Sequence, residues 1–204
     1  MRIVLEFSYR IIKHFIESLQ FTDQSPKVVG FSNESKRLQD CAYIHVGDYV
    51  NCTVRGNLVL QHHLGASEDR WQAIDSNATM YGTVQGSIGV IFQLSPYLFA
   101  FLKEVEGRLK TTITPVGGFS HDNWRAFKSR KKIRMAQNFI DGDLIESFLD
   151  LDYEDKEKIV RGLCIPVSMK DFGIAGMDPQ KEPEVKQCLI EDLVKIIEDI
   201  SRLH

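Results

Sequence analysis

The sequence predicts a β-then-α fold, in which strands come first and helices follow. Within residues 42–94, short runs of alternating apolar and polar residues are separated by turns that contain glycine, a pattern typical of antiparallel strands. After Ser95-Pro96, apolar residues recur every three or four positions, as they do on the buried face of a helix. Because strands do not alternate with helices, we expect separate β and α layers rather than an alternating α/β sheet.

The first thirty residues are expected to form a helix and a linker. Apolar residues at helical spacing predict an amphipathic helix within residues 1–21, although residues 3–5 (Ile-Val-Leu) also suit a strand. Residues 22–30 contain polar residues, serine and proline, and indicate a linker. Residues 32–40 are charged, which predicts a loop or a short helix before the first strand.

Five short strands are expected next. Gln85-Gly86 forms a two-residue link between the last two of them, with glycine at a position that needs a positive φ. Residues 64–77 are polar and predict a loop. Such strands occur in sandwiches, barrels and propeller blades, and periodicity does not decide among these folds. The expected strands cover residues 42–46, 49–54, 57–63, 78–84 and 87–94.

Serine followed by proline marks the start of the helical part, because serine caps a helix and proline suits its first position. Ser120 is expected to cap a second, short helix. Trp124 and Phe127 are three positions apart, so we expect both aromatic rings to pack in the core. The buried face of the first helix is predicted to comprise Leu98, Phe101, Leu102, Val105 and Leu109.

The stretch from Phe139 to Asp152 (FIDGDLIESFLDLD) combines an apolar pair, an acidic turn with glycine, and a helix. Asp143, followed three positions later by Glu146, predicts an N-cap with a capping-box acid. An alternative is that Asp141, Asp143 and Glu146 hold a hard cation. One short turn supplies too few oxygen ligands for such a site, so a charged helix start is the favoured interpretation.

Two further helices are expected towards the C-terminus. Asp152 is predicted to cap a helix over residues 153–163. Residues 164–183 contain three prolines and two glycines and predict a loop. The last helix is expected over residues 184–203, with a buried face formed by Leu189, Leu193, Ile196, Ile197 and Ile200.

Composition gives only broad limits on function. The chain has 204 residues and a net charge of −3, which offers no general reason to expect nucleic-acid binding. No stretch approaches the roughly 20 apolar residues of a membrane helix, so no membrane partner is expected. The cysteines form no CxxC pair and are expected to be reduced, mostly buried thiols of an intracellular protein. They are Cys41, Cys52, Cys164 and Cys188.

No catalytic, metal-binding or cofactor-binding group is expected. The sequence has no GxSxG elbow and no recognisable catalytic cysteine signature. His62 and His63 are adjacent on a predicted strand and point to opposite faces, which disfavours a metal site with His45. Glycines at positions 82, 86 and 89 lie within two strands with no helix after them, so a dinucleotide loop is disfavoured as well.

The basic run KSRKKIR at residues 128–134 is the one patch that could contact phosphate or an import receptor. Nuclear import is favoured over DNA contact, because no aromatic residue is interleaved for base stacking. The alternative is a solvated loop without a partner. The basic residues are Lys128, Arg130, Lys131, Lys132 and Arg134.

Four separated motifs occur in an order that resembles one known family. They are GTVQGSIGVI (82–91), NWRAF (123–127), IDGDLIESFLDL (140–151) and EDLVKIIEDISRLH (191–204). The chain from about Phe31 to His204 resembles the C-terminal end of the damage-specific DNA-binding protein 1 family, the large subunits of UV-damaged DNA-binding complexes. This family belongs to a superfamily with the large cleavage-and-polyadenylation subunit. Residues 1–30 do not resemble it.

The resemblance implies a fold with three parts: a divergent N-terminal helix and linker (1–30), the last blades of a seven-bladed β-propeller (31–94), and a C-terminal helical domain (95–204). A few strands cannot close a seven-bladed ring, and open sheet edges favour aggregation. The chain is therefore expected to be a fragment or truncated form of a larger scaffold.

The resemblance also implies a noncatalytic scaffold that presents substrate-receptor proteins to a cullin-4 RING ubiquitin ligase, in DNA repair and protein turnover. The cullin would bind only through parts absent from this chain, and the location would be the nucleus and also the cytoplasm. One alternative is an RNA-processing scaffold of the same superfamily, for splicing or polyadenylation. Another is direct nucleic-acid binding through the basic run.

Receptor proteins of the family insert a helix near segments that here read GDYVN (47–51) and GTVQG (82–86). Tyr49, Asn51 and Val84 therefore correspond to receptor-contacting positions. An aromatic ring, an amide and a small apolar group can form a helix-docking surface. Tyrosine stands where the family has phenylalanine, which bears on receptor choice. The alternative is that these are ordinary blade residues.

Overall fold

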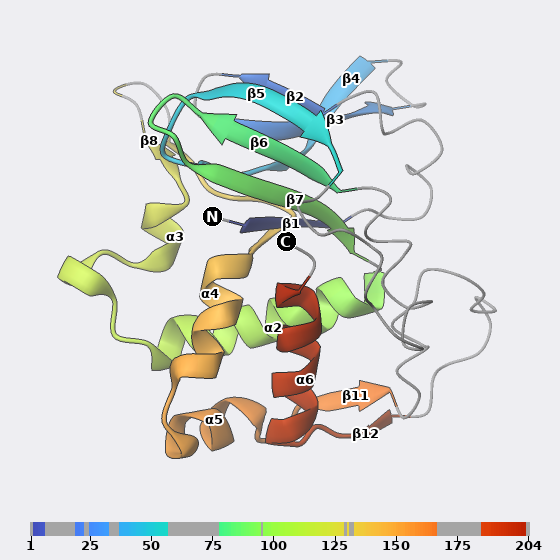
Figure 1. The fold of residues 1–204 in the computed structure, drawn as a ribbon, viewed down its shortest axis with the longest axis vertical. Coiled ribbons are helices and arrows are strands. Elements are labelled where there is room, and N and C mark those ends of the chain that lie inside the picture. The colour runs from blue at the N-terminus through green and yellow to red at the C-terminus, as the bar shows by residue number, and fades with distance from the viewer. Residues whose placement is uncertain are drawn as a thin grey trace.

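The computed structural model separates strands from helices, with the sheets at one end of the molecule and the helices at the other (Figure 1). The expected β-then-α order is observed, although short strands also occur within the helical half. The structure describes residues 2–6, 19–22, 25–32, 37–56, 78–94, 96–128, 130, 133–166 and 185–202.

The largest sheet in the described part of the chain has five strands in the order β10-β1-β7-β6-β5. β1 lies in its interior, parallel to β7 and antiparallel to β10. The sheet therefore joins the N-terminal strand to a strand from the helical half of the sequence. Its strands are β1 (Arg2–Glu6), β5 (Val50–Arg55), β6 (Thr79–Thr83), β7 (Ile88–Leu94) and β10 (Phe139–Asp141).

The expected helix over residues 1–21 is wrong wherever the structure describes it. Arg2–Glu6 and Leu19–Thr22 are strands, and residues 7–18 lie outside the described part. Ile3 and Val4 are β-branched and favour strands. β1 pairs with a strand on each side, so the alternative of a strand at residues 3–5 is confirmed.

A second sheet has three antiparallel strands in the order β2-β3-β4. Its strands replace the linker expected at residues 22–30 and the loop or helix expected at 32–40, so both expectations are wrong where the structure describes these residues. The central strand of this sheet, β3, pairs with β2 on one side and with β4 on the other. A bulge between Val28 and Val29 shifts the register of its pairing with β4. The strands are β2 (Leu19–Thr22), β3 (Ser25–Ser32) and β4 (Arg37–Tyr43).

The strands expected at 49–54, 78–84 and 87–94 are confirmed as β5, β6 and β7. Of the strand expected at 42–46, only the first two residues belong to β4, and residues 44–46 are irregular. The strand expected at 57–63 lies outside the described residues. Gly86 has a φ of 89°, as expected, but the link between β6 and β7 covers residues 84–87 and is longer than the two residues predicted.

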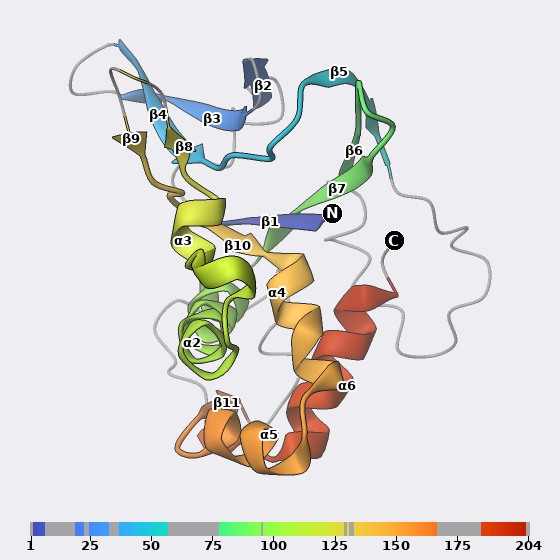
Figure 2. The ribbon, with the colours of Figure 1, turned by 90° about the vertical axis from the view of Figure 1, so that its left-hand side faces the viewer.

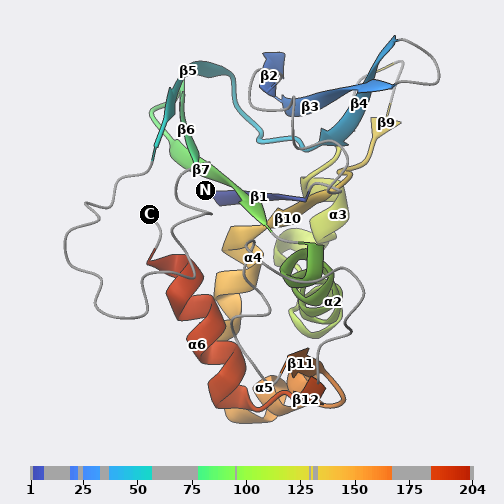
Figure 3. The same cartoon turned by 90° about the vertical axis from the view of Figure 1, so that its right-hand side faces the viewer.

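Helix α2 (Pro96–Thr112) runs beneath the five-stranded sheet and is the central helix of the lower layer (Figures 1 and 3). It begins at Pro96, and its five predicted core residues are all buried, so both expectations are confirmed. After the 3-10 turn η4 (Val116–Gly118) comes the short helix α3 (His121–Trp124). Ser120 Oγ accepts a hydrogen bond from the Asn123 N–H at 3.3 Å, so the predicted cap is also confirmed.

The remaining helices are α4 (Gly142–Glu146), η5 (Ser147–Asp150), α5 (Tyr153–Val160) and α6 (Ile190–Ser201). Of these, α4 and α5 pack against α2, and α6 packs against α4 and α5 at the lower end of the molecule (Figure 3). Two hairpins complete the described structure: β8 (Phe127–Lys128) with β9 (Ile133–Arg134), and β11 (Cys164–Pro166) with β12 (Val185–Gln187).

One hydrophobic core connects β7 to the helices. On β7, Val90, Phe92 and Leu94 are buried in it, and α6 contributes Leu193, Ile196, Ile197 and Ile200. Leu189 was expected in this set but is exposed, because it precedes α6 as its N-cap residue and does not lie on the helical face. The β-layer and the helices therefore share a core.

The cysteines are only partly as expected. Cys188 is buried, whereas Cys52 and Cys164 are free and exposed, because they lie on the edge strand β5 and on a short hairpin. Burial raises the pKa of the Cys188 thiol to about 12, so it is protonated at neutral pH. In the described part of the chain, no helix is long and apolar enough to cross a membrane.

Candidate functional site

The three predicted docking residues lie at one end of the β5–β6–β7 strands. The Val84 N–H donates a hydrogen bond to the Tyr49 carbonyl at 2.9 Å, which brings the loop before β5 against the β6–β7 turn. The side chains of both residues are exposed, Tyr49 at 51% and Val84 at 63%. Asn51, the second residue of β5, is exposed as well. The structure therefore brings Val84 to the segment that carries Tyr49 and Asn51, although Val84 is more than 30 positions away in sequence.

The β6–β7 turn that carries Val84 is tightly hydrogen-bonded. The Thr83 N–H donates to the Ser87 carbonyl at 2.9 Å, and the Gly86 N–H donates to the Thr83 carbonyl at 3.0 Å. The Ser87 N–H also donates to Thr83 Oγ1 at 3.0 Å. These bonds fix the backbone on which the exposed Val84 side chain stands.

Asp48 joins this turn to the loop before β5. Its Oδ1 accepts a hydrogen bond from the Tyr49 N–H at 2.6 Å, and its Oδ2 accepts one from the Gln85 N–H at 3.1 Å. Hydrogen bonding from the Thr83 side chain, together with these two amides, holds the pKa of Asp48 below its usual value. The carboxylate is therefore ionised at neutral pH.

Gly82 lies opposite the side chain of Cys52. A Cβ atom at Gly82 would lie 2.7 Å from Cys52 Sγ and 3.9 Å from Asn51 Oδ1. Cys52 and Gly82 are paired across β5 and β6. A larger residue at position 82 would therefore force the Cys52 side chain to move, whereas its distance to Asn51 is an ordinary van der Waals contact.

The ends of the predicted basic run pair as two short antiparallel strands, and the described Lys128 and Arg130 are exposed, so the solvated-loop alternative stays open. Lys128 pairs with Ile133, and Phe127 pairs with Arg134. The Arg134 guanidinium lies over the Tyr43 ring, 4.4 Å from its centroid. Arg130 is exposed, whereas Lys131 and Lys132 lie outside the described residues. The geometry leaves the import and phosphate-contact hypotheses as predictions.

Trp124 is 65% exposed, so its expected place in the core is wrong. The helix α3 ends at Trp124, and the buried positions go to Arg125 and Ala126 instead. Phe127 belongs to β8, where its ring meets the edge of His45 with the centroids 5.7 Å apart. Because the helix stops between the two aromatic residues, helical spacing does not apply to them.

A buried ion-pair cluster connects α3 to the start of α4. Figure 2 shows α3 beside β10, the strand that leads into α4. Asp141 Oδ2 accepts hydrogen bonds from Arg125 Nε and, at 2.8 Å, from His121 Nε2. Arg125 Nη2 also lies 3.4 Å from Asp143 Oδ2. Burial raises the pKa of Asp141, but the hydrogen bonds from His121 and Arg125 outweigh it and hold the pKa below its usual value.

This cluster corrects the predicted helix cap. Asp141, and not Asp143, is the N-cap of α4, and its Oδ1 accepts a hydrogen bond from the Asp143 N–H at 3.2 Å. The Asp141 N–H in turn donates to Oε1 of the buried Glu106 at 3.2 Å. The Asp141 carboxylate is thus fully used by protein partners. Among the described residues, no group of three or more His, Cys, Asp or Glu side chains could hold a metal ion.

The histidine pair suggested as a metal alternative, His62 and His63, lies outside the described residues. The sequence did not indicate the role of Asp48, because an exposed aspartate after glycine is a common turn residue. It also did not indicate that Arg125 and Asp141, which belong to two of the four motifs, are partners. Their separation of 16 positions carries no helical or strand periodicity.

Comparison with known proteins adds the family. A family profile described as the CPSF A subunit region matches residues 17–150. DNA damage-binding protein 1 of Drosophila melanogaster is 34% identical over 184 residues, which are 90% of this chain and 14% of that protein. The protein of the same name from Solanum lycopersicum is 35% identical over 171 residues, which are 84% of this chain and 13% of that protein. The chain therefore spans 13–14% of the length of these relatives.

Proposed function

Because the chain belongs to the family of the CPSF A subunit region, we propose that it is a noncatalytic scaffold segment that presents a docking surface to partner proteins. The similarity to DNA damage-binding protein 1, which the four sequence motifs predicted, supports a role in the response to DNA damage. As a segment that spans 13–14% of such relatives, it would act as one part of a longer scaffold.

The observation that carries the proposal is the exposure of Tyr49 and Val84 on two segments that are hydrogen-bonded to each other. Tyrosine is one of the residues enriched at the hot spots of protein interfaces, and the exposed Val84 side chain adds apolar surface that a partner can bury. Asn51 adds an amide that can donate and accept hydrogen bonds. Together, the ring and the aliphatic group can contact the apolar face of a helix, and the amide can hydrogen-bond to the backbone groups at the end of the helix.

The partners we propose are the substrate-receptor proteins of a cullin-4 RING ubiquitin ligase. The cullin itself would bind through parts of the longer scaffold that this chain does not contain. In this role the chain carries no catalytic residue, and ubiquitin transfer belongs to partner proteins. We place the protein in the nucleus and also the cytoplasm, with the basic residues 128–134 as the import signal.

We further propose that the sheets are blades of a β-propeller that the longer protein completes. Five of the six residues of the edge strand β5 are exposed, and an adjacent strand or blade would cover them. The core shared by β7 and the helices would then anchor the helical domain to the propeller.

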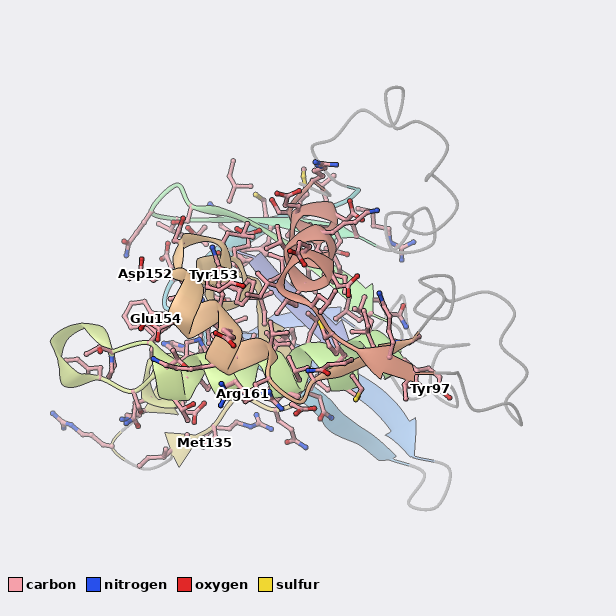
Figure 4. All side chains as sticks on the ribbon, turned by 90° about the horizontal axis from the view of Figure 1, so that it is seen from below. Tyr97, Met135, Asp152, Tyr153, Glu154 and Arg161 are labelled. Atoms are coloured by element: carbon pink, nitrogen blue, oxygen red, sulfur yellow. The ribbon has the colours of Figure 1, made fainter. Side chains whose placement is uncertain are left out.

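An affinity-capture experiment tests the docking surface. The parent chain and the variants Tyr49→Ala and Asn51→Ala are used to capture proteins from nuclear extract, which are then identified by mass spectrometry. Tyr153→Ala is the matched control, because Tyr153 is 72% exposed on α5, at the opposite end of the molecule (Figures 1 and 4). We expect the parent and the control to retain receptor proteins that both docking variants lose.

The same partners in all four samples would contradict the docking surface. Splicing or polyadenylation proteins among the specifically lost partners would instead support the RNA-processing branch of the superfamily. The matched relatives carry the name of the damage-binding branch, which favours the capture of receptor proteins over the capture of RNA-processing proteins.

A second candidate function is direct nucleic-acid binding, which the exposure of Trp124 favours. Lys128 Nζ donates a hydrogen bond to Asn123 Oδ1 at 3.0 Å, which joins the basic hairpin to the residue that precedes the exposed Trp124. A cationic strand next to an aromatic ring suits a single-stranded nucleic acid, whose bases stack while phosphates contact lysine and arginine.

Fluorescence anisotropy with a labelled single-stranded oligonucleotide tests this function. The affinity should fall steeply with salt, and Lys128→Glu with Arg130→Glu should weaken binding and reduce the salt dependence. Lys158→Glu on α5 is the matched charge control, since Lys158 is exposed and remote. Equal binding by the hairpin variant and the control would rule the function out.

A further inference from the structure

One carboxylate connects the two segments that carry the proposed docking surface. Asp48 precedes Tyr49, and its two oxygens accept hydrogen bonds from the backbone N–H groups of Tyr49 and Gln85. Gln85 lies directly after Val84 and is 37 positions from Asp48 in sequence. The side chain of Thr83, on the other side of Val84, also hydrogen-bonds to Asp48. The carboxylate is thus bonded to the docking residue Tyr49 itself and to both sequence neighbours of Val84.

We propose that Asp48 is a positioning residue, whose ionised carboxylate fixes Tyr49 and Val84 at one relative position before a partner arrives. This inference rests on the proposed function of the surface. Asp48 acts through the backbone of its neighbours, and its own contacts with Tyr49, Gln85 and Thr83 are all intramolecular. Its role would be to preorganise the docking surface.

The physical basis is the strength of hydrogen bonds from backbone amides to an ionised acceptor. Such bonds are shorter and stronger than neutral ones, as the 2.6 Å bond from the Tyr49 N–H illustrates. Without the carboxylate, the Tyr49 and Val84 segments would keep the hydrogen bond from the Val84 N–H to the Tyr49 carbonyl but lose those to Asp48, so they would be held less firmly. A partner would then have to order both segments on binding, which lowers the affinity.

The role concerns binding rather than folding. Asp48 is in an exposed loop, and the turn after β6 keeps its own bonds among Thr83, Gly86 and Ser87 without it. Asp48→Asn preserves the size of the side chain but replaces one acceptor oxygen by an NH₂ group. That group would face a backbone N–H, and two donors cannot bond to each other. The substitution therefore removes one of the two connections with little change to the core.

The binding arm of the test uses a synthetic helical peptide from a cullin-4 substrate receptor as the probe. Its Kd is measured for the parent, Tyr49→Ala, Asp48→Asn and Asp48→Glu, with Asp152→Asn as the control. Within the described part of the chain, the Asp152 side chain caps no backbone N–H of α5, so the control loses the same charge without losing such a bond. Figure 4 shows Asp152 at the start of α5, in the helical half.

We expect Asp48→Asn to raise the Kd about tenfold, the effect of losing one charge-assisted hydrogen bond. Asp48→Glu, which restores two anionic oxygens, should bind more tightly than Asp48→Asn, and the control should match the parent. Thermal unfolding midpoints should be equal, because the core is unchanged. A parent-like Kd for Asp48→Asn, with binding lost in Tyr49→Ala, would overturn the positioning role and leave the proposed function intact.

The second arm is independent of any partner. NMR hydrogen exchange should show at least one of the Tyr49 and Gln85 amides exchanging about tenfold faster in Asp48→Asn than in the parent, with β6 and β7 amides unchanged. If the peptide binds neither the parent nor the variants, the proposed function fails, and this arm alone decides whether Asp48 fixes the two segments. Unchanged exchange at both amides would overturn the inference.

Discussion

At the scale of single residues, the ion pair between Arg125 and Asp141 explains why two distant motifs occur together. The motif NWRAF supplies the guanidinium and IDGDLIE supplies the carboxylate, and both side chains are buried. Asp141 also caps α4, so one carboxylate fixes α3 against the start of the next helix. The acidic turn that suggested a cation site in the sequence therefore takes part in an internal ion pair.

Replacing Arg125 with alanine should strongly destabilise the protein. The change leaves the buried Asp141 carboxylate without its main counterion, and breaking such a buried pair costs about 3–5 kcal/mol. The free energy of unfolding, measured by urea denaturation, should fall by that amount. Arg161→Ala is the control, because Arg161 is exposed on the end of α5 and should cost less than about 0.5 kcal/mol (Figure 4). Equal effects of the two variants would refute the buried pair.

The same cluster predicts an acid dependence of stability. The folded-state pKa of Asp141 lies below its usual value of 3.8, so the folded state favours the ionised carboxylate. Its stabilising contribution is fully present above pH 3.8 and is lost as the pH falls through the folded pKa. The urea midpoint should therefore decline in that acid range, and less steeply in Asp141→Asn. An identical slope in the variant would contradict the assignment.

At the scale of elements, α2 is the helix on which the lower layer packs. Leu102 lies in its centre and is buried against the core that β7, α4, α5 and α6 share. Leu102→Ala should lower the free energy of unfolding by about 2–5 kcal/mol, because it removes buried methyl groups and leaves a cavity. Tyr97→Ala, on the same helix but exposed, is the control and should change stability little. Similar losses in both would show that the helix is not packed as described.

The elements also show what the sequence could predict. Helical periodicity located α2 and α6, although α6 begins at Ile190 and not at residue 184. The alternative strand at residues 3–5 is observed within β1, whereas β3 was missed because pairing with its sequence neighbours β2 and β4 forms a strand where the composition suggested a linker. Trp124 was misplaced because its helix is only four residues long. The docking positions came from the resemblance, while the hydrogen bonds of Asp48 to Gln85 required the fold.

At the scale of the whole molecule, the strand β1 and the shared core join the ends of the chain into one structure. The N-terminal strand pairs with β7 and with β10, and α6 packs into the same core near the C-terminus. The docking surface lies at the outer end of the β-layer, on the side away from α5 and the β11–β12 hairpin (Figures 1 and 2). A partner could therefore bind there without disturbing the helical half.

The docking surface is tested by titrating a purified cullin-4 substrate receptor against the parent chain and against Val84→Asp. Val84 is exposed, so a charge at this position should leave the fold intact while it disrupts an apolar contact. We expect at least a tenfold weaker affinity for Val84→Asp, and an unchanged affinity for Tyr153→Asp on α5. Equal affinities for the parent and Val84→Asp would contradict it.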